Sequence, residues 1–267
     1  MEESIITSTQ NAKVKHVVAL QQKSALRRKE GFFVVEGRRE LMHCVEAGYE
    51  VVETFVLADL ADLSEPDRLG AVFKVSPQVY EKMAYRGSTE GVMAVVREQS
   101  RSLEDLQLGA APLIMVLERV EKPGNLGAVL RSADAAKADA VIICDPLTDL
   151  YNPNLIRSSI GAIFSVPCVA CSSEACITFL KAHGIQILTA QLQDSSLYYD
   201  TDMLGGTAIV MGTESTGLTD VWRQAADAHI RIPMLGQLDS LNVSVSAAIL
   251  LFEAVRQRQS VKPENCY

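Results

Sequence analysis

The stretch Ile230–Arg256, IRIPMLGQLDSLNVSVSAAILLFEAVR, contains the elements around which the rest of the chain is organised. Its first residues, Ile230–Ile232, predict a short strand that Pro233 ends. A polar loop follows, and a strongly apolar helix is predicted from about Val243. Free backbone N–H groups at a helix N-terminus favour anionic or polar ligands. The loop is therefore either an ordinary connection from a strand to a helix or one wall of a binding site.

Strands and helices alternate regularly from Leu113 onward, and the strands are apolar throughout, as in a parallel sheet that is buried on both faces. The predicted strands are Leu113–Leu117, Ala140–Cys144, Val166–Ala170, Gln186–Ala190, Ala208–Met211 and His229–Ile232, with helices near 126–138, 153–163, 173–183, 219–226 and 243–258. This alternation predicts an α/β fold with a mainly parallel sheet. In such folds, ligands bind at the carboxyl ends of the strands.

Residues 1–97 predict a separate small α/β domain. Its helices are expected at 9–22, 37–47 and 77–85, and its strands at 32–35, 51–58, 71–75 and 91–96. Residues 98–111 are polar and then rich in small side chains, which is typical of an interdomain linker. We therefore expect a second domain at 112–267.

Basic residues are concentrated in one segment of an otherwise acidic chain. The net charge is −8, yet residues 11–39 carry eight Lys and Arg against two Glu, a local charge of +6 that leaves −14 on the rest. Such a segment is either a solvated helix face or a patch that contacts nucleic-acid phosphates. The candidate contacts are Lys13, Lys15, Arg27, Arg28, Lys29 and Arg38.

The composition, with 48% hydrophobic and 22% charged residues, predicts an ordered globular protein. No apolar run approaches the roughly 20 residues that span a bilayer, and the start, MEESIITSTQ, resembles no secretory signal. The six cysteines lack the spacing of a disulfide framework, which predicts reduced thiols in a cytoplasmic protein. Cys168, Cys171 and Cys176 are the candidate metal ligands. Without a second CxxC motif, we expect no metal.

Two further polar loops follow predicted strands. In ERVEKPGNLGAVLR (118–131), glycines flank Asn125 in a turn that a ligand could approach closely. Arg131, on the helix that follows, either pairs with Asp134 on the surface or faces a ligand. In MGTESTGL (211–218), Glu214 either caps the next turn or binds donor groups. Neither loop has the GxGxxG or Walker pattern, which argues against a nucleotide-binding oxidoreductase.

The three loops together resemble, in order, the three motifs of the SpoU (TrmH-like) RNA ribose 2′-O-methyltransferases of the SPOUT superfamily. The resemblance covers about residues 111–258. The matching residues are Asn125-x-Gly127 with Arg131, then Gly212-x-Glu214-x-x-Gly217-Leu218, then Ile232-Pro233-Met234 with Ser240-Leu241-Asn242-Val243-Ser244. Thr213 departs from the family pattern, because asparagine is frequent at that position.

Two other segments also resemble the family. Tyr151-Asn152-Pro153 with Arg157-x-Ser159-x-Gly161-Ala162-x-Phe164 is similar to a further family segment, although Asn154 stands where lysine is common. The N-terminal Ser8…Asn11-x-Lys13-x-Lys15 and Phe33-Val34-Val35-Glu36-Gly37 resemble the ribosomal-protein-like substrate-binding domain that precedes many of these catalytic domains.

The resemblance implies a deep trefoil knot, in which the final helix is threaded through an earlier loop, and a site for S-adenosylmethionine. The backbone of Gly212, Ile232 and Leu241 would hold the adenosine part of the cofactor. Five residues would surround the reacting methyl group and ribose: Asn125, Arg131, Glu214, Ser240 and Asn242. Because arginine stays charged in proteins, Arg131 is expected to clamp a phosphate and stabilise a developing alkoxide, with an RNA phosphate as a candidate proton acceptor.

The implied reaction is methyl transfer to a ribose 2′-hydroxyl of RNA. The N-terminal resemblance favours ribosomal over transfer RNA by analogy. A transfer-RNA methyltransferase and a non-catalytic RNA-binding module of the same fold remain the alternatives. The family also implies a homodimer. The final helix is apolar around most of its circumference, which predicts burial in the knot or at a subunit interface.

Overall fold

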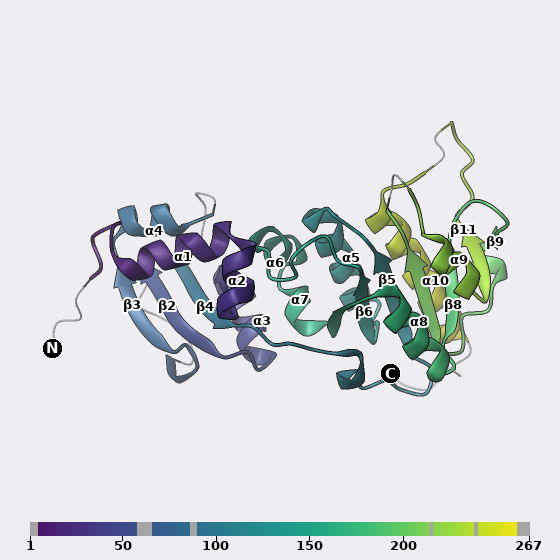
Figure 1. The fold of residues 1–267 in the computed structure, drawn as a ribbon, viewed down its shortest axis with the longest axis horizontal. Coiled ribbons are helices and arrows are strands. Elements are labelled where there is room, and N and C mark those ends of the chain that lie inside the picture. The colour runs from purple at the N-terminus through teal and green to yellow at the C-terminus, as the bar shows by residue number, and fades with distance from the viewer. Residues whose placement is uncertain (1–4, 58–65, 86–89, 214–215, 238–239, 261–267) are drawn as a thin grey trace. The chain divides into compact units, whose positions relative to one another are not determined.

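The computed structural model describes residues 5–57, 66–85, 90–213, 216–237 and 240–260 (Figure 1). The chain forms two compact units. One comprises residues 1–100 together with 149–165, and the other comprises residues 101–148 together with 166–267. Glu214, a predicted catalytic residue, lies outside the described residues.

The first unit is built on a four-stranded sheet in the order β1-β4-β2-β3. β4 lies antiparallel to both β1 and β2, whereas β2 and β3 are parallel. The strands are β1 (Phe32–Glu36), β2 (Val51–Leu57), β3 (Ala71–Val75) and β4 (Val92–Arg97). One face packs against α1 (Ala12–Gln22) and α4 (Pro77–Met83) around buried Phe55 and Met93. These elements agree with the pattern expected for a small α/β domain.

The other face of this sheet carries an aromatic cluster that joins two distant parts of the sequence. The rings of Phe33 on β1 and Tyr151 stack with centroids 4.3 Å apart, and Phe164 lies 6.0 Å from Phe33. Tyr151 precedes the short helix α6 (Pro153–Ser159), and Phe164 lies within the next one, α7 (Ala162–Ser165). Residues 149–165 were expected within the second domain, and they pack with the first unit because their aromatic side chains complete its core.

Gly161 is required where this segment meets α3 (Arg38–Glu46). Its φ is +84°, a backbone conformation that side chains disfavour, and a Cβ there would lie 2.8 Å from Cδ2 of His43. The glycine of the segment that resembles the family therefore has a packing reason within the first unit.

The second unit contains a seven-stranded sheet in the order β7-β6-β5-β10-β8-β11-β9, in which every pair is parallel. This confirms the predicted mainly parallel α/β sheet. The strands are β5 (Leu113–Glu118), β6 (Ala140–Cys144), β7 (Cys168–Cys171), β8 (Gln186–Ala190), β9 (Ser196–Leu197), β10 (Thr207–Met211) and β11 (Ala228–Arg231). Only β9 was not predicted, because two residues are too short to show a pattern.

Helices cover both faces of this sheet (Figure 1). One face packs on α8 (Ser173–Ala182) and α9 (Asp220–Ala225), with Trp222 fully buried. On the other face, α5 (Pro123–Ala135) packs against β6, and α10 (Val243–Ser260) packs against β5, β10 and α5. No helix in the described parts of the chain is long and apolar enough to cross a membrane.

Part of the expected linker belongs to the second unit. A single helical turn, η2 (Leu103–Asp105), is followed by Leu106 and Leu108, and all three leucines pack against the core that contains Trp222. These apolar side chains attach the segment from Arg101 onward to the sheet. The polar residues of 98–111, which suggested a linker, account only for the exposed side of this segment. The remaining short turns are η1 (Pro66–Arg68) and η3 (Tyr198–Asp200).

A short helix, α2 (Ser24–Glu30), was not predicted and contains three of the candidate RNA contacts. One of them, Arg27, is 3% exposed. Its Nε donates to the carboxylate of Asp149 at 2.7 Å, and its Nη1 donates to the carbonyls of Leu20 and Gln21. The expectation that Arg27 contacts RNA was therefore wrong, because a buried and fully engaged guanidinium has no donor facing solvent.

Candidate functional site

A cavity of about 160 Å³ lies at the carboxyl ends of three neighbouring strands of the second unit, β8, β10 and β11. Its wall is mainly apolar, and a few polar side chains interrupt it. The apolar residues are Ala190, Leu192, Met211, Ile230, Ile232, Met234, Leu241 and Leu250, and the polar or charged ones are Gln191, Arg231, Ser240 and Ser246. This position agrees with the rule that parallel sheets bind ligands at the carboxyl edge of their strands.

The cavity brings together parts of two predicted loops. Ile232 and Leu241, two of the three expected cofactor residues, both line it, and so does Ser240 from the expected catalytic group. The third expected cofactor residue, Gly212, directly follows the lining residue Met211. The stretch from Ile230 to Leu250 thus forms one side of the cavity.

The first and third loops are joined by a hydrogen bond between two predicted catalytic residues. Nδ2 of Asn242 donates to Oδ1 of Asn125 over 3.2 Å. Oδ1 of Asn242 caps α10, because it accepts from the backbone N of Ser244 at 2.9 Å and from its hydroxyl at 2.6 Å. The Asn242 amide is therefore held in one orientation, and it places Asn125 beside the loop that lines the cavity.

Gly212 and Gly217, near the two ends of the second loop, are in close backbone contact. A Cβ on Gly212 would lie 2.2 Å from the carbonyl O of Gly217, so only glycine fits there. The hydroxyl of Thr213 accepts from the backbone N of Thr216 at 3.1 Å and bonds the Thr216 hydroxyl at 2.8 Å. Thr213, which departs from the family pattern, thus closes the turn with its own side chain.

Glu118 is a site residue that the sequence reasoning missed. It is 2% exposed at the end of β5, and its two carboxylate oxygens accept from the backbone N and the hydroxyl of Thr219 at 2.9 and 2.6 Å. These bonds fix the end of the second loop to the strand that precedes the first loop. The available signal was a charged residue directly after a run of buried apolar residues, where an unpaired carboxylate would be costly.

Arg131 is exposed on α5. It is six residues after Asn125, which places the two side chains about 120° apart around the helix. Among the described residues, Arg131 does not share in the hydrogen bonds that join Asn125 to Asn242. The structure therefore brings together Asn125, Ser240 and Asn242, and it leaves the Arg131 guanidinium facing solvent.

The remaining candidate RNA contacts differ in how available they are. Lys13 forms an ion pair with Glu53 and lies 4.6 Å from the centroid of the Phe73 ring. Lys15, Arg28 and Lys29 are exposed, and Arg38 is partly exposed. The exposed side chains on α1 and α2 are therefore the basic groups that can reach a phosphate without breaking a bond inside the first unit.

Comparison with known proteins identifies the family. A model of the "SpoU rRNA Methylase family" matches residues 112–252, which is more than half of the chain. The chain belongs to the SpoU family. A model of an "MRM3-like substrate binding domain" matches residues 11–94, within the first unit.

Relatives of this SpoU protein match nearly its whole length. It is 28% identical to the Bacillus subtilis 23S rRNA (guanosine(2553)-2′-O)-methyltransferase RlmP, over 92% of this chain and 97% of the relative. It is 31% identical to a 23S rRNA (uridine(2479)-2′-O)-methyltransferase of Streptomyces viridochromogenes, over 95% and 92%. The crystal structure of an AdoMet-bound rRNA methyltransferase from Sinorhizobium meliloti is 27% identical, with a TM-score of 0.87 over 97% of this chain and 99% of that one.

Proposed function

We propose that this protein transfers a methyl group from S-adenosylmethionine to a ribose 2′-hydroxyl of ribosomal RNA. The observation that carries the proposal is the cavity at the ends of β8, β10 and β11. Its wall includes the SpoU motif residues Ile232, Met234, Ser240 and Leu241, and the same loop carries Asn242, which is hydrogen-bonded to Asn125. Relatives that align over nearly the whole chain are 23S rRNA 2′-O-methyltransferases.

The cavity wall fits an adenosyl group. Apolar side chains such as Ile232 and Leu241 suit the faces of a flat base, while Gln191, Ser240 and Ser246 offer polar atoms for its edges and for a ribose. When bound, S-adenosylmethionine supplies an electrophilic methyl group.

The protein's own contribution is to position and stabilise the reacting groups, since a correctly oriented pair can gain about 7–11 kcal/mol relative to free reactants. The capped orientation of Asn242 fixes Asn125, and we assign both side chains to the ribose side of the site on the basis of the family motifs. The exposed guanidinium of Arg131 is available to an RNA phosphate and to negative charge that develops on the ribose oxygen. We assign Glu214 and Ser240 to the same site on the basis of the family motifs.

A calorimetric titration and a comparison of transfer rates test the cofactor and the substrate of this proposal. Isothermal calorimetry of the purified chain should show binding of S-adenosylmethionine and none of NAD, which separates a methyltransferase from an oxidoreductase. Methyl transfer should then be faster to unmodified 23S ribosomal RNA than to unmodified transfer RNA. Binding of RNA without any transfer would instead identify a non-catalytic module of the same fold.

Gly212→Ala is expected to weaken S-adenosylmethionine binding at least about tenfold, or about 1.4 kcal/mol. The added Cβ would collide with the Gly217 carbonyl, so the turn next to Met211 in the cavity wall must shift. Calorimetry provides the measurement. Gly205→Ala is the matched control, because a Cβ at Gly205 meets no atom within 4 Å. Equal affinities in the two variants would exclude the turn from the cofactor site.

We propose that the first unit binds the RNA through the exposed basic residues of α1 and α2. Replacing Lys15, Arg28 and Lys29 with glutamine should lower RNA affinity and reduce the slope of log K against log salt by about 2–3, because each phosphate contact contributes about 0.7–0.9. Fluorescence anisotropy at several salt concentrations measures both. Lys137→Gln with Lys181→Gln, exposed residues of the second unit, is the control. An unchanged slope would mean that the patch is only a solvated face.

We also propose a homodimer and the family's trefoil knot, both centred on α10. The contacts of α10 with α5, β5 and β10 support its place in a knotted core. The apolar surface of α10 was expected to be buried, yet one face of the helix is exposed in the single chain. Val245 is 47% and Phe252 46% exposed, and Ile249 is half-buried between them. Residues at this i, i+4, i+7 spacing form one apolar stripe, which suits a two-fold interface. Because its relatives are 23S rRNA methyltransferases, we propose a cytoplasmic location.

Phe252→Glu is expected to convert the dimer to monomer at micromolar concentration, because it places two charges in a closed apolar interface. Sedimentation velocity measures the change. Val221→Glu, on the exposed side of α9 and also in the second unit, is the matched control and should leave the dimer intact. A wild-type protein that sediments only as a monomer would contradict the proposal.

A further inference from the structure

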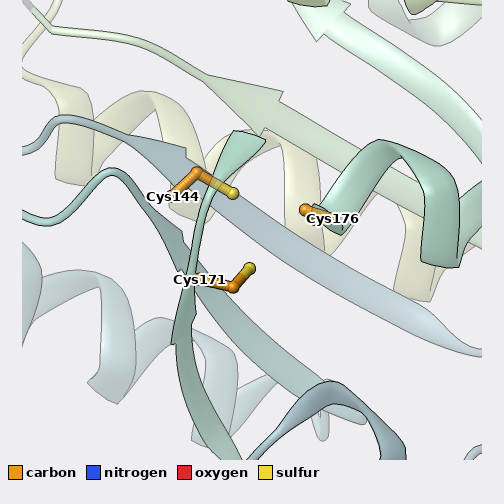
Figure 2. A group of neighbouring side chains, drawn as sticks. All are labelled: Cys144, Cys171 and Cys176. Atoms are coloured by element: carbon orange, nitrogen blue, oxygen red, sulfur yellow. The ribbon is translucent and has the colours of Figure 1, made fainter. Parts of the chain in front are cut away.

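Three cysteines from different elements of the second unit converge on one point (Figure 2). Cys144 ends β6, Cys171 ends β7, and Cys176 lies in the first half of α8. Their three sulfur atoms all lie within 4.8 Å of one another. Cys144 and Cys176 are fully buried, and Cys171 is partly exposed.

The fold holds these sulfurs together from three directions. Cys144 and Cys171 are direct partners in the parallel register of β6 and β7, so their side chains leave the same face of the sheet. The chain then turns at Ser172, which caps α8, and the helix brings Cys176 over that face. Cys168, three residues before Cys171 on the same strand, points to the opposite face, because side chains alternate along a strand.

The cluster is separate from the cavity at the ends of β8, β10 and β11. It lies on β6 and β7, and β5 stands between these strands and β10 in the sheet order. Nothing in the proposed methyl transfer uses these thiols. Their neighbours include the apolar core residues Ile142 and Leu180, beside which side chains without a reactive atom would fill the same space.

We propose that Cys144, Cys171 and Cys176 bind one thiophilic d¹⁰ cation, Zn²⁺ or Cu⁺. Sulfur ligands at a Zn–S distance of about 2.3 Å in tetrahedral or trigonal geometry lie about 3.8–4.0 Å apart, so the observed limit of 4.8 Å requires only a small closure. Soft thiolates select these two ions over Mg²⁺ and Ca²⁺, which prefer oxygen.

The three sulfurs already interact with one another, since the thiols of Cys144 and then Cys176 donate hydrogen bonds to the sulfur of Cys171 and so lower its pKa. Each thiol must lose its proton to the solvent as the ion enters, because the thiolate is the form that binds metals.

A hydrogen-bonded chain next to the cluster holds α8 in place. The carboxylate of Asp145, which follows Cys144, accepts from the Ser173 hydroxyl at 2.6 Å. That hydroxyl accepts from Nε1 of Trp222 at 2.9 Å. The start of α8, and with it Cys176, is therefore fixed relative to the end of β6 before any ion binds, as in sites whose outer partners orient the ligands.

The experiment uses the full-length chain, reduced, stripped with a chelator and titrated without oxygen, with Zn²⁺ and Cu⁺ in separate arms. We expect one ion per chain, measured by elemental analysis after gel filtration, and a higher Tm in its presence. Co²⁺ in place of Zn²⁺ should give an intense sulfur-to-metal charge-transfer band. Competition against chelators of known affinity for each ion decides between the two cations.

Cys171→Ser and Cys176→Ser should each lose the stoichiometric ion and the charge-transfer band. Cys168→Ser, a buried cysteine outside the cluster, is the matched control and should keep both. Because a buried substitution can prevent folding, alkylation of the wild-type protein provides a second readout. Iodoacetamide should modify Cys171 in the stripped protein, and the bound ion should protect it.

Two results would overturn the proposal. One is a stripped wild-type chain that takes up no more Zn²⁺ or Cu⁺ than the Cys171→Ser variant, with alkylation of Cys171 unaffected by either ion. The other is a chain that binds neither ion but loses two hydrogens in mass on mild oxidation, which would identify two of the three thiols as a disulfide pair.

Discussion

Arg131→Ala is expected to lower the rate of methyl transfer by about 10²–10³-fold or more, while the affinity for S-adenosylmethionine remains near that of the wild type. The two quantities should separate because Arg131 is exposed on α5 and is absent from the described cavity wall, so we propose that it acts on the RNA and not on the cofactor. In the proposed mechanism, its permanent charge stabilises a developing alkoxide and holds a phosphate. Single-turnover kinetics and calorimetry measure the two effects independently.

The matched control is Lys137→Ala, which removes a positive charge just after the C-terminal end of the same helix. It should leave transfer within about twofold, since a distant surface charge contributes little in salt. Arg131→Lys should recover only part of the rate, because an ammonium cannot make the paired hydrogen bonds of a guanidinium. Wild-type turnover in Arg131→Ala would refute the assigned role.

Arg27→Ala is expected to lower the free energy of unfolding of the first unit by about 3–5 kcal/mol. The substitution leaves the Asp149 carboxylate, 13% exposed, without its cation, and it removes the donors to the carbonyls at the end of α1. The ion pair also holds the start of the 149–165 segment on the first unit. We therefore expect the α1–α2 region and this segment to loosen together.

Hydrogen exchange of α1, α2 and residues 149–165 is the direct measurement. Trp222, the single tryptophan, lies in the second unit, so its fluorescence should change little. Arg28→Ala is the control, since the neighbouring arginine is exposed, and exposed substitutions typically change stability by no more than about 0.5 kcal/mol. If the Arg27→Ala and Arg28→Ala variants show the same hydrogen-exchange rates in these segments, the ion pair of Arg27 with Asp149 adds nothing to the stability of the first unit.

The sheet of the second unit was predictable because its strands are uninterrupted apolar runs between helical patterns. Local pattern failed where the deciding contact is distant in sequence. Tyr151 and Phe164 lie between the parallel strands β6 and β7 in the sequence, yet their rings pack on Phe33, more than a hundred residues earlier. The basic run on α2 likewise gave no sign that Arg27 meets a carboxylate at position 149.

The location of the site was predictable, and its hydrogen bonds were predictable only in part. Three polar loops after parallel strands indicated a ligand edge, and the family resemblance assigned residues to it. Spacing alone does not state that Asn242 bonds Asn125, since the two are separated by 117 positions. Glu118 could not be recognised from the sequence, because a charged residue directly after a strand reads as the first residue of an exposed loop. Only the structure places its partner, Thr219, beside it.

The most direct test of the central claim follows a labelled methyl group. The purified protein is incubated with S-adenosylmethionine labelled in its methyl group and with unmodified 23S ribosomal RNA, and the RNA is then digested with alkali. A methylated 2′-hydroxyl blocks alkaline cleavage at that nucleotide. The account predicts label in alkali-resistant dinucleotides with the wild type and almost none with Arg131→Ala. Label confined to mononucleotides, which marks methylated bases, or no label at all would contradict it.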